Sequence, residues 1–158
     1  MVVAKAKTSD LLGVFGLLRD NDLPFEGVAE DLRNFLVVKD GREIIGCAGL
    51  EIHGRIGLLR SVAVKKERHG QGLGKTLISR IFNLARNKNI EKLYLLTIDS
   101  SQFFSRFGFE RIERNKVDPV IQQTEMFTHC CPCSSVVMVK DLNKGEKNDH
   151  TAGRTQDS

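Results

Sequence analysis

The most informative segment of the chain is Leu58-Leu59-Arg60-Ser61-Val62-Ala63-Val64-Lys65-Lys66-Glu67-Arg68-His69-Gly70-Gln71-Gly72-Leu73-Gly74-Lys75-Thr76-Leu77. The first part is largely apolar and is typical of a buried strand. Three alternate glycines follow, and apolar residues then recur with a helical period. The stretch therefore predicts a strand that passes through a glycine-rich turn directly into an amphipathic helix.

The turn at Gly70, Gly72 and Gly74 is suited to an anion. Glycine lets a backbone approach a ligand closely and adopt angles that other residues resist. The first amides of a helix have no partner within it and lie at its positive end. Together these features form a cradle for a phosphate or pyrophosphate. The spacing fits neither a Walker loop nor a Rossmann fingerprint, and a glycine-rich connection without a ligand stays open as an alternative.

Upstream of this stretch, period-two runs and a hairpin turn at Asp40-Gly41 predict an antiparallel meander. Its strands are expected over residues 35–39, 43–52 and 58–64. A first strand over residues 2–6, a helix capped by Thr8-Ser9-Asp10, and a short helix over residues 28–34 are expected before it. The capped helix carries Leu11, Leu12, Phe15 and Leu18 at helical spacing.

Downstream, Leu73, Leu77, Ile81 and Leu84 stack along one helix face. Later strands are expected over residues 92–97, 109–114 and 135–142, with short helices over 100–107 and 118–127. This order predicts an α+β layered fold in which a mixed, mostly antiparallel central sheet has helices on both faces. Residues 1–142 are expected to form one domain, and residues 143–158 a polar, disordered tail.

Composition narrows the classes of function. The chain has 158 residues, of which 41% are apolar and 28% charged, as in a soluble globular domain. The net charge is +4, but basic and acidic residues alternate, so no nucleic-acid partner is expected. We find neither an apolar run of the roughly 20 residues that a membrane helix needs nor an export signal. We therefore expect a cytoplasmic protein with no membrane partner, and free thiols at its four cysteines.

Two motifs resemble those of the GNAT superfamily of acetyltransferases. His69-Gly70-Gln71-Gly72-Leu73-Gly74 resembles the acetyl-CoA-binding motif Arg/Gln-x-x-Gly-x-Gly/Ala, with a histidine in its first position. Phe103-Phe104-Ser105-Arg106-Phe107-Gly108-Phe109 resembles the second family element Phe-Tyr-x-x-x-Gly-Phe. The resemblance covers roughly residues 2–142 in order and spacing. It implies an acetyl-CoA-dependent N-acetyltransferase with a GNAT-like fold.

The resemblance also implies which residues hold acetyl-CoA. The amides of Gln71, Gly72, Gly74 and Lys75 would bind the pyrophosphate, and the backbone of Val62 and Val64 would pair with the pantetheine arm as an added strand. Lys66, Lys75 and Arg106 are candidates for the adenosine 3'-phosphate. The full set of expected cofactor contacts is Val62, Ala63, Val64, His69, Gly70, Gln71, Gly72, Leu73, Gly74, Lys75, Phe104 and Arg106.

Acetyl transfer to an amine needs a base, an oxyanion donor and a way to release the thiolate. The Val62 amide is the expected oxyanion donor. Phe104 replaces the tyrosine that protonates the thiolate in many family members, so the general acid is not identified. The sole tyrosine, Tyr94, is expected to pack in the sheet.

Glu51 is the expected base. It shares a strand face with Cys47 and Gly49, whose small side chains are expected to leave room for a substrate. His53 is the second candidate for the base. Arg60 would suit a substrate carboxylate, with a salt bridge as the alternative reading.

The segment His129-Cys130-Cys131-Pro132-Cys133 invites a metal or metalloid interpretation. No metal is expected, because a structural zinc site draws its ligands from two separated pairs and no second pair is present. Residues 116–138 resemble the arsenic-resistance (ArsN-like) and small N-acetylglutamate-synthase-like subgroup, which implies a small amino acid or analogue as the acceptor. The alternatives are a protein or peptide N-acetyltransferase and a non-catalytic acyl-CoA or metalloid sensor. A homodimer is possible for the family.

Overall fold

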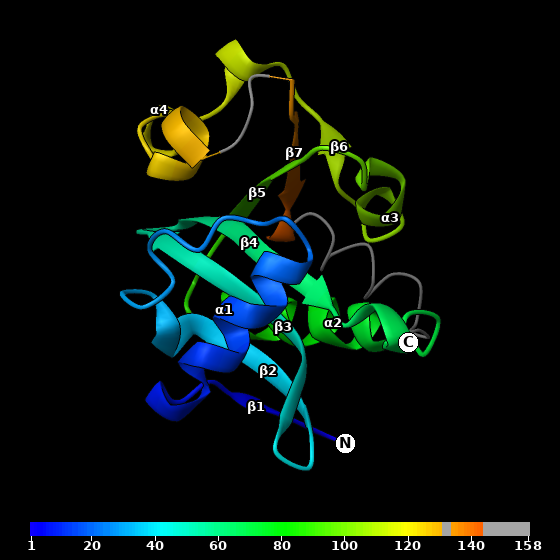
Figure 1. The fold of residues 1–158 in the computed structure, drawn as a ribbon. Helices are drawn as coiled ribbons and strands as arrows, with labels where there is room; N and C mark the ends of the chain where they lie inside the picture. Colours follow the sequence, from blue (N-terminus) through cyan, green and yellow to red (C-terminus); the bar gives the residue numbers. More distant parts are fainter. Residues whose placement is uncertain (131–133, 144–158) are drawn as a thin grey trace.

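The computed structural model describes residues 1–130 and 134–143, which form a central sheet with helices packed on both faces (Figure 1). The seven strands lie in the order β1-β2-β3-β4-β5-β7-β6. Only β4 and β5 run parallel to each other, and the other neighbours are antiparallel. The predicted α+β fold with a mixed sheet is confirmed. The strands are β1 (Val2–Lys5), β2 (Phe35–Asp40), β3 (Glu43–His53), β4 (Ile56–Val64), β5 (Lys92–Thr97), β6 (Glu110–Arg111) and β7 (Val136–Asp141).

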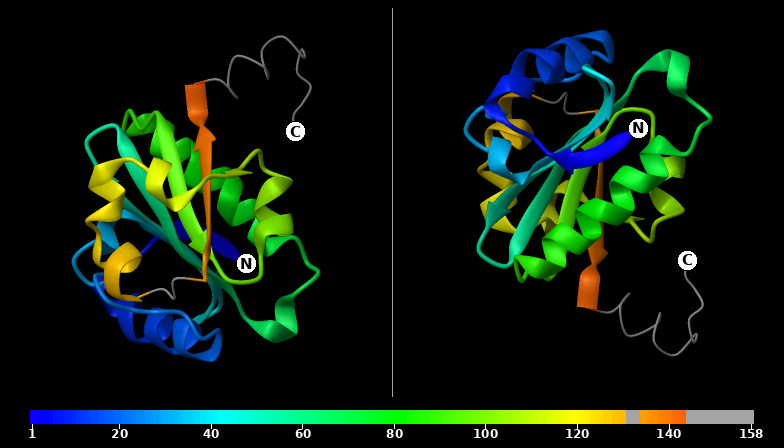
Figure 2. Two further views of the ribbon diagram at one scale, coloured as in Figure 1. Left: turned by 90° about the horizontal axis from the view of Figure 1, so that it is seen from above. Right: turned by 90° about the horizontal axis from the view of Figure 1, so that it is seen from below.

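The helices cover the sheet unevenly. Figure 2 shows α1 and α4 on one side of the sheet and α2 on the other. The helices are α1 (Leu11–Asp20), α2 (Leu73–Asn87), α3 (Ser101–Ser105) and α4 (Pro119–Gln122), with a π-helical turn over Met126–Cys130.

Three groups of buried side chains hold these layers together. The largest joins α2 to the sheet through residues such as Leu77, Ile81 and Leu50. On the opposite face α1 packs over β2 and β3 in a second cluster. A third cluster, which includes Leu58 and Tyr94, lies under α4 and the π-helical turn. The packing role expected for Tyr94 is confirmed. The second and third clusters both lie on the α1 side of the sheet, and neither includes the polar residues Glu51, His53 and Arg60.

Asp10 stabilises the start of α1. Its carboxylate accepts a hydrogen bond from the Lys7 amide at 2.8 Å and lies 2.9 Å from the Lys39 ammonium. Burial raises the pKa of Asp10, but the bonds from Lys39 and Lys7 outweigh burial and leave the pKa below its ordinary value. The cap expected at Thr8–Asp10 takes another form: Asp10 precedes α1, but its side chain bonds no amide of the helix and instead closes the short 3-10 turn before it through the Lys7 amide.

Three local expectations were wrong. Residues 28–34 form turns and only one 3-10 turn at Leu32–Asn34, because so short a segment does not repay helix nucleation. Leu12 is 83% exposed, while Val14, Leu17 and Leu18 form the buried face of α1. The strand expected over 109–114 shortens to two residues, since β7 pairs with it only at Val139 and Met138.

Within the described part of the chain, no helix is long and apolar enough to cross a membrane. Of the tail expected over residues 143–158, residues 144–158 lie outside the described residues, as do Cys131 and Cys133.

Candidate active site

The sheet opens between β4 and β5. The two strands pair only where Ile56, Gly57 and Leu58 meet β5, although β4 continues to Val64. On its other side, the pairing of β4 with β3 shifts register beyond Cys47. Ser61 lies in this irregularity with a φ of 59°. Such a bulge bends a strand, so the second half of β4 presents main-chain groups that β5 does not use.

The main chain of Val62 and Val64 points toward this opening. The Lys65 amide donates to the Ile45 carbonyl of β3 at 2.8 Å. Because alternate residues of a strand present their amides to the same neighbour, Ala63 also faces β3, while Val62 and Val64 face away from it. His69 agrees with this arrangement, since its Nε2 lies 3.0 Å from the Val64 carbonyl oxygen.

The glycine-rich turn lies directly after this strand. Gly70 and Gly72 adopt φ values of 84° and 80°, and a Cβ added at either would meet no atom within 4 Å. Gly72 is also the N-cap residue of α2, immediately before the helix begins at Leu73. Gly74 differs, because a Cβ there would lie 3.1 Å from the Phe103 ring. The first two glycines therefore supply conformation and open space, and the third supplies close packing.

The basic residues near the turn fall into two groups. Lys65 is paired with Glu43, and Arg68 is paired with Asp40. These two pairs hold the turn against the hairpin between β2 and β3. Within residues 1–130 and 134–143, no ion pair involves the three cations predicted to meet a phosphate, which are Lys66, Lys75 and Arg106.

The second element forms an aromatic cluster around α3. Phe104 is only 7% exposed and packs edge-on against Phe103 and Phe109, with ring centroids 5.1 and 5.9 Å apart. Phe103 in turn covers Gly74. The ring of Phe104, predicted to contact the cofactor, thus lies in the core that supports the start of α2.

A polar cluster lies on the α1 side of the sheet. His53 Nε2 lies 2.7 Å from Glu51 Oε2, and Arg60 Nη1 lies 3.9 Å from Glu51 Oε1. Arg60 Nε donates to the Ser61 hydroxyl at 3.0 Å, which links the cluster to the bulge. The Arg60 side chain is 1% exposed, and its Nη2 has no hydrogen-bond partner among the described residues. The structure thus brings together Glu51, His53 and Arg60, the three side chains predicted for base and substrate binding.

Asp31 belongs to the same cluster, although no motif or periodic pattern indicated it. Burial raises the pKa of Asp31, and the negative charge of Glu51 adds to this, while Arg60 and His53 act in the opposite direction. Asp31 lies in the loop between α1 and β2, whose Gly27 covers Arg60: a Cβ on Gly27 would be 3.1 Å from Arg60 Nη1 and 3.9 Å from Asp31 Oδ2.

The room expected beside Glu51 is not there. A Cβ on Gly49 would lie 2.3 Å from the Phe35 ring, so that ring fills the space above the glycine. Cys47 is fully buried, and burial raises the pKa of its thiol to about 12. In addition, the pairing of β2 with β3 shifts register near Ile44. Ile44 therefore packs on the α1 side of the sheet and Ile45 on the α2 side, whereas strict alternation along β3 would place each on the opposite side.

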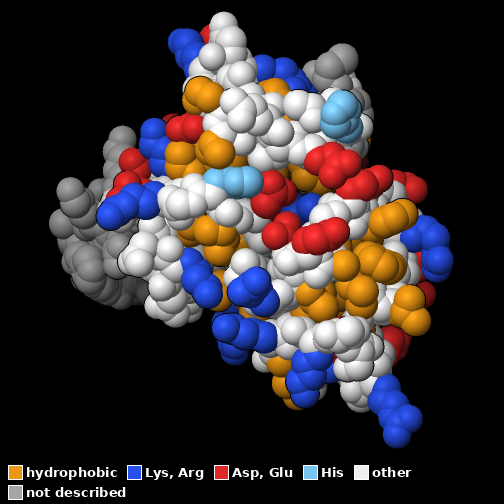
Figure 3. All heavy atoms as spheres, turned by 90° about the vertical axis from the view of Figure 1, so that its left-hand side faces the viewer, with side chains coloured by type: hydrophobic (Ala, Val, Ile, Leu, Met, Phe, Trp, Pro, Cys, Tyr) orange, Lys and Arg blue, Asp and Glu red, His pale blue; other side chains and the backbone are white. Residues whose placement is uncertain are grey.

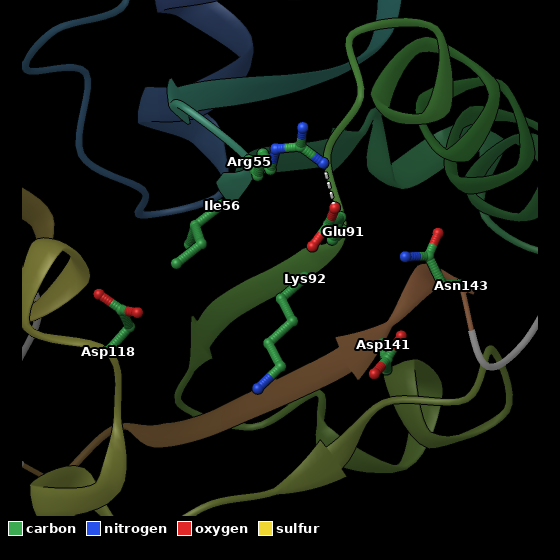
Figure 4. Close-up of a pocket in the computed structure, with 7 residues that line it drawn as sticks. All are labelled: Arg55, Ile56, Glu91, Lys92, Asp118, Asp141 and Asn143. Carbon is green, nitrogen blue, oxygen red and sulfur yellow. Dashed lines mark hydrogen bonds and ion pairs between the residues drawn. The ribbon is translucent and has the colours of Figure 1, made fainter.

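A pocket of about 550 Å³ lies elsewhere, where β4 and β5 begin (Figure 4). Arg55 and Glu91 form an ion pair of 2.5 Å at its rim. No residue predicted for the site lines this pocket. Its lining consists of Arg55, Ile56, Glu91, Lys92, Asp118, Asp141 and Asn143. We therefore place the candidate site at the opening beside β4, at the other end of that strand. Among the described residues, no three His, Cys, Asp or Glu side chains gather to hold a metal ion.

Comparison with known proteins agrees with this geometry. A model of the acetyltransferase (GNAT) domain family matches residues 31–111, just over half of the chain. An uncharacterized N-acetyltransferase of Chlorobaculum tepidum is 27% identical over 121 residues, which cover 74% of this chain and 76% of that protein. An amino-acid acetyltransferase of Mycobacterium tuberculosis is 30% identical over 90 residues, which cover 56% of this chain and 48% of the enzyme.

Solved structures share the fold. N-acetylglutamate synthase from Neisseria gonorrhoeae, complexed with coenzyme A and N-acetyl-glutamate, superposes with a TM-score of 0.78 at 19% identity. That match covers 89% of this chain but only 35% of the synthase chain. A Mycobacterium tuberculosis protein in complex with CoA and NLQ gives a TM-score of 0.74 at 21% identity, and 99% of its chain is covered.

Proposed function

This chain belongs to the GNAT family of acetyl-CoA-dependent N-acetyltransferases, and we propose that it acetylates the amino group of a small amino acid or amino-acid analogue. The observation that carries the proposal is the position of Glu51, His53 and Arg60 beside the bulge at Ser61, next to the open edge of β4. The names of the sequence relatives, among them amino-acid acetyltransferases, support the same acceptor class.

In this proposal acetyl-CoA lies along the open edge of β4. The main chain of Val62 and Val64 pairs with the pantetheine arm, because these groups have no strand beside them. The turn at Gly70 and Gly72 holds the pyrophosphate at the start of α2, where free amides and the helix dipole favour negative charge. The remaining contacts proposed for the cofactor are Ala63, His69, Gln71, Leu73, Gly74, Lys75, Phe104 and Arg106.

Each step of the transfer is then given a group. Glu51 takes a proton from the acceptor ammonium, either directly or through the hydrogen-bonded His53 or water. The freed nitrogen lone pair attacks the thioester carbon, and the Val62 amide stabilises the oxyanion. As the carbonyl re-forms, the carbon–sulfur bond breaks and CoA leaves as a thiolate, and the second proton of the attacking nitrogen passes to that sulfur or to solvent to give the neutral amide. With a thiol pKa of about 8.5, such a thiolate is a tolerable leaving group, which suits a chain with Phe104 in place of the family tyrosine.

Arg60 points to an acceptor with a carboxylate. A buried guanidinium with an unmet donor is costly, and a carboxylate is the group whose geometry best matches it. The loop that carries Gly27 covers this arginine, so it must shift to admit the acceptor. A peptide acceptor has no free α-carboxylate near its amino group and leaves Nη2 unpaired.

The experiment follows thiol release from acetyl-CoA with a panel of amino acids, analogues and short peptides. Turnover on free amino acids is expected, and Glu51→Gln should lower kcat while acetyl-CoA binding persists. General-base catalysis contributes about 10²–10⁴-fold, so a loss in that range is expected. Glu43→Gln, on the same strand but in the ion pair with Lys65, is the matched control.

Unchanged kcat in Glu51→Gln would remove Glu51 as the base. Turnover on peptides alone would replace a small acceptor with a protein or peptide. Acetyl-CoA binding with no turnover on any amine would favour a sensor. The cytoplasmic location and a homodimer remain predictions from the sequence.

A further inference from the structure

Two groups of opposite charge in the polar cluster, Arg60 Nη2 and the Asp31 carboxylate, lack a hydrogen-bond partner among the described residues. The Arg60 side chain is buried, and its Nη2 has no hydrogen-bond partner among the described residues. Asp31 is half-buried, and no hydrogen bond or ion pair to another described residue engages its carboxylate. Gly27 lies between the two groups, close to both. A molecule that satisfies both must carry a negative and a positive group.

The charge of this cluster is not balanced. Arg60 is the single permanently charged cation of the cluster, and Glu51 already lies 3.9 Å from it. Asp31 adds a second carboxylate, and Glu30 lies near enough to raise the pKa of Asp31 further. Figure 3 shows acidic side chains gathered beside an exposed hydrophobic area on the face at the left of Figure 1. An acceptor that brings a second carboxylate would therefore meet like charge at this rim.

The reacting amine of the acceptor does not neutralise the excess negative charge of the cluster. It must lose its proton to attack the thioester, so its positive charge disappears before the transfer. The α-carboxylate of an amino acid offsets Arg60. Glu51 is hydrogen-bonded to His53 at 2.7 Å, so within the described part of the chain Asp31 is the carboxylate of the cluster without a partner. The group of the acceptor that remains to pair with Asp31 is its side chain.

Building on the proposed function, we propose that the acceptor is an amino acid with a positively charged side chain, and that Asp31 selects it. Asp31 is thus a specificity-determining residue, which neither the reaction nor the family motifs require. It acts at the rim of the site, whereas Arg60 holds the α-carboxylate at its floor.

The test uses arginine, glutamine and glutamate, three acceptors of similar reach whose side chains carry charges of +1, 0 and −1. Thiol release from acetyl-CoA gives kcat/KM for each with the full chain. Close charge pairs in protein sites are worth at least about tenfold in affinity, so arginine should exceed glutamate by about tenfold or more. Asp31→Asn should bring the arginine-to-glutamate ratio of kcat/KM close to one. Glu30→Gln, an exposed change of the same charge one residue away, should keep the preference.

The outcomes distinguish a failure of this inference from a failure of the proposed function. If amino acids are turned over but glutamate equals or exceeds arginine, the inference is overturned and the proposed function stands. The same holds if Asp31→Asn leaves the arginine-to-glutamate ratio unchanged. If no free amino acid is acetylated, the proposed function fails and this inference fails with it. Calorimetric titration of CoA, which does not contact Asp31 in this proposal, into the Asp31→Asn protein separates a lost acceptor contact from a misfolded variant.

Discussion

A carboxylate placed at Gly72 tests the phosphate cradle directly. In the native protein Gly72 adopts a φ of 80°, and a Cβ at this position would have open space around it for 4 Å. Any substitution there costs backbone strain of about 1–2 kcal/mol, because L-residues resist the left-handed region. Gly72→Gln carries that strain and the added bulk alone. Gly72→Glu adds a negative charge where the pyrophosphate is expected.

The difference between these two variants isolates the electrostatic effect. Two unit charges about 4 Å apart repel by about 1 kcal/mol in water and about 4 kcal/mol at an effective dielectric constant of about 20. The turn is exposed, so we expect the lower half of this range for each phosphate charge. For the nearer phosphate charge alone this repulsion is about 1–2.5 kcal/mol, so Gly72→Glu should bind CoA about 5- to 60-fold more weakly than Gly72→Gln.

Calorimetric titration of CoA into both variants measures this ratio, and urea unfolding confirms that the two proteins are equally stable. High salt should shrink the ratio, since exposed charges are screened beyond a Debye length of about 3 Å at 1 M. Equal CoA affinities in the two folded variants would show that the pyrophosphate does not lie at this turn.

Asp10→Asn should lower the free energy of unfolding by about 1–2 kcal/mol at pH 7, because a neutral amide weakens the bonds that the carboxylate makes with the Lys7 amide at 2.8 Å and the Lys39 ammonium at 2.9 Å. Because the pKa of Asp10 is lowered in the folded protein, the wild-type advantage is complete above the unfolded pKa of about 3.9 and is lost as the pH falls through the folded value. Urea unfolding of both proteins at pH 7 and pH 2 checks this, and an equal deficit at both would contradict it. Burial raises the pKa of Cys47 to about 12, so iodoacetamide at pH 8 should label it only after denaturation, as read by peptide mass spectrometry. Gly49→Ala should lower stability by about 1–3 kcal/mol, because the new Cβ would overlap the Phe35 ring, and adding Phe35→Leu should recover part of the loss. An unchanged Tm in the single variant would mean that the ring moves aside freely.

Most of the strands and helices could be predicted from local sequence patterns. Alternation along β2, β3 and β4, the hairpin turn at Asp40-Gly41 and the helical period of α2 placed these elements close to their observed bounds. These features depend on neighbouring residues and on backbone geometry alone, which is why the sequence specifies them. The glycine spacing likewise indicated an anion cradle before any contact was known.

The register within the sheet was a different matter. The irregularity at Ser61 and the shift near Ile44 depend on how two strands fit together, and neither leaves a periodic trace. Phe35 closes the space over Gly49 for the same reason: the two residues meet only because β2 pairs with β3.

Sequence patterns indicate the order of strands and helices, the glycine turn and the side chains suited to acid–base chemistry. Packing between distant segments brings Glu51, His53 and Arg60 into one cluster, adds Asp31 from a distant loop and buries Phe104, and no local pattern records these contacts. The physical reason is that local preferences act over a few residues, whereas a site is made by packing between segments that meet only after the sheet has formed.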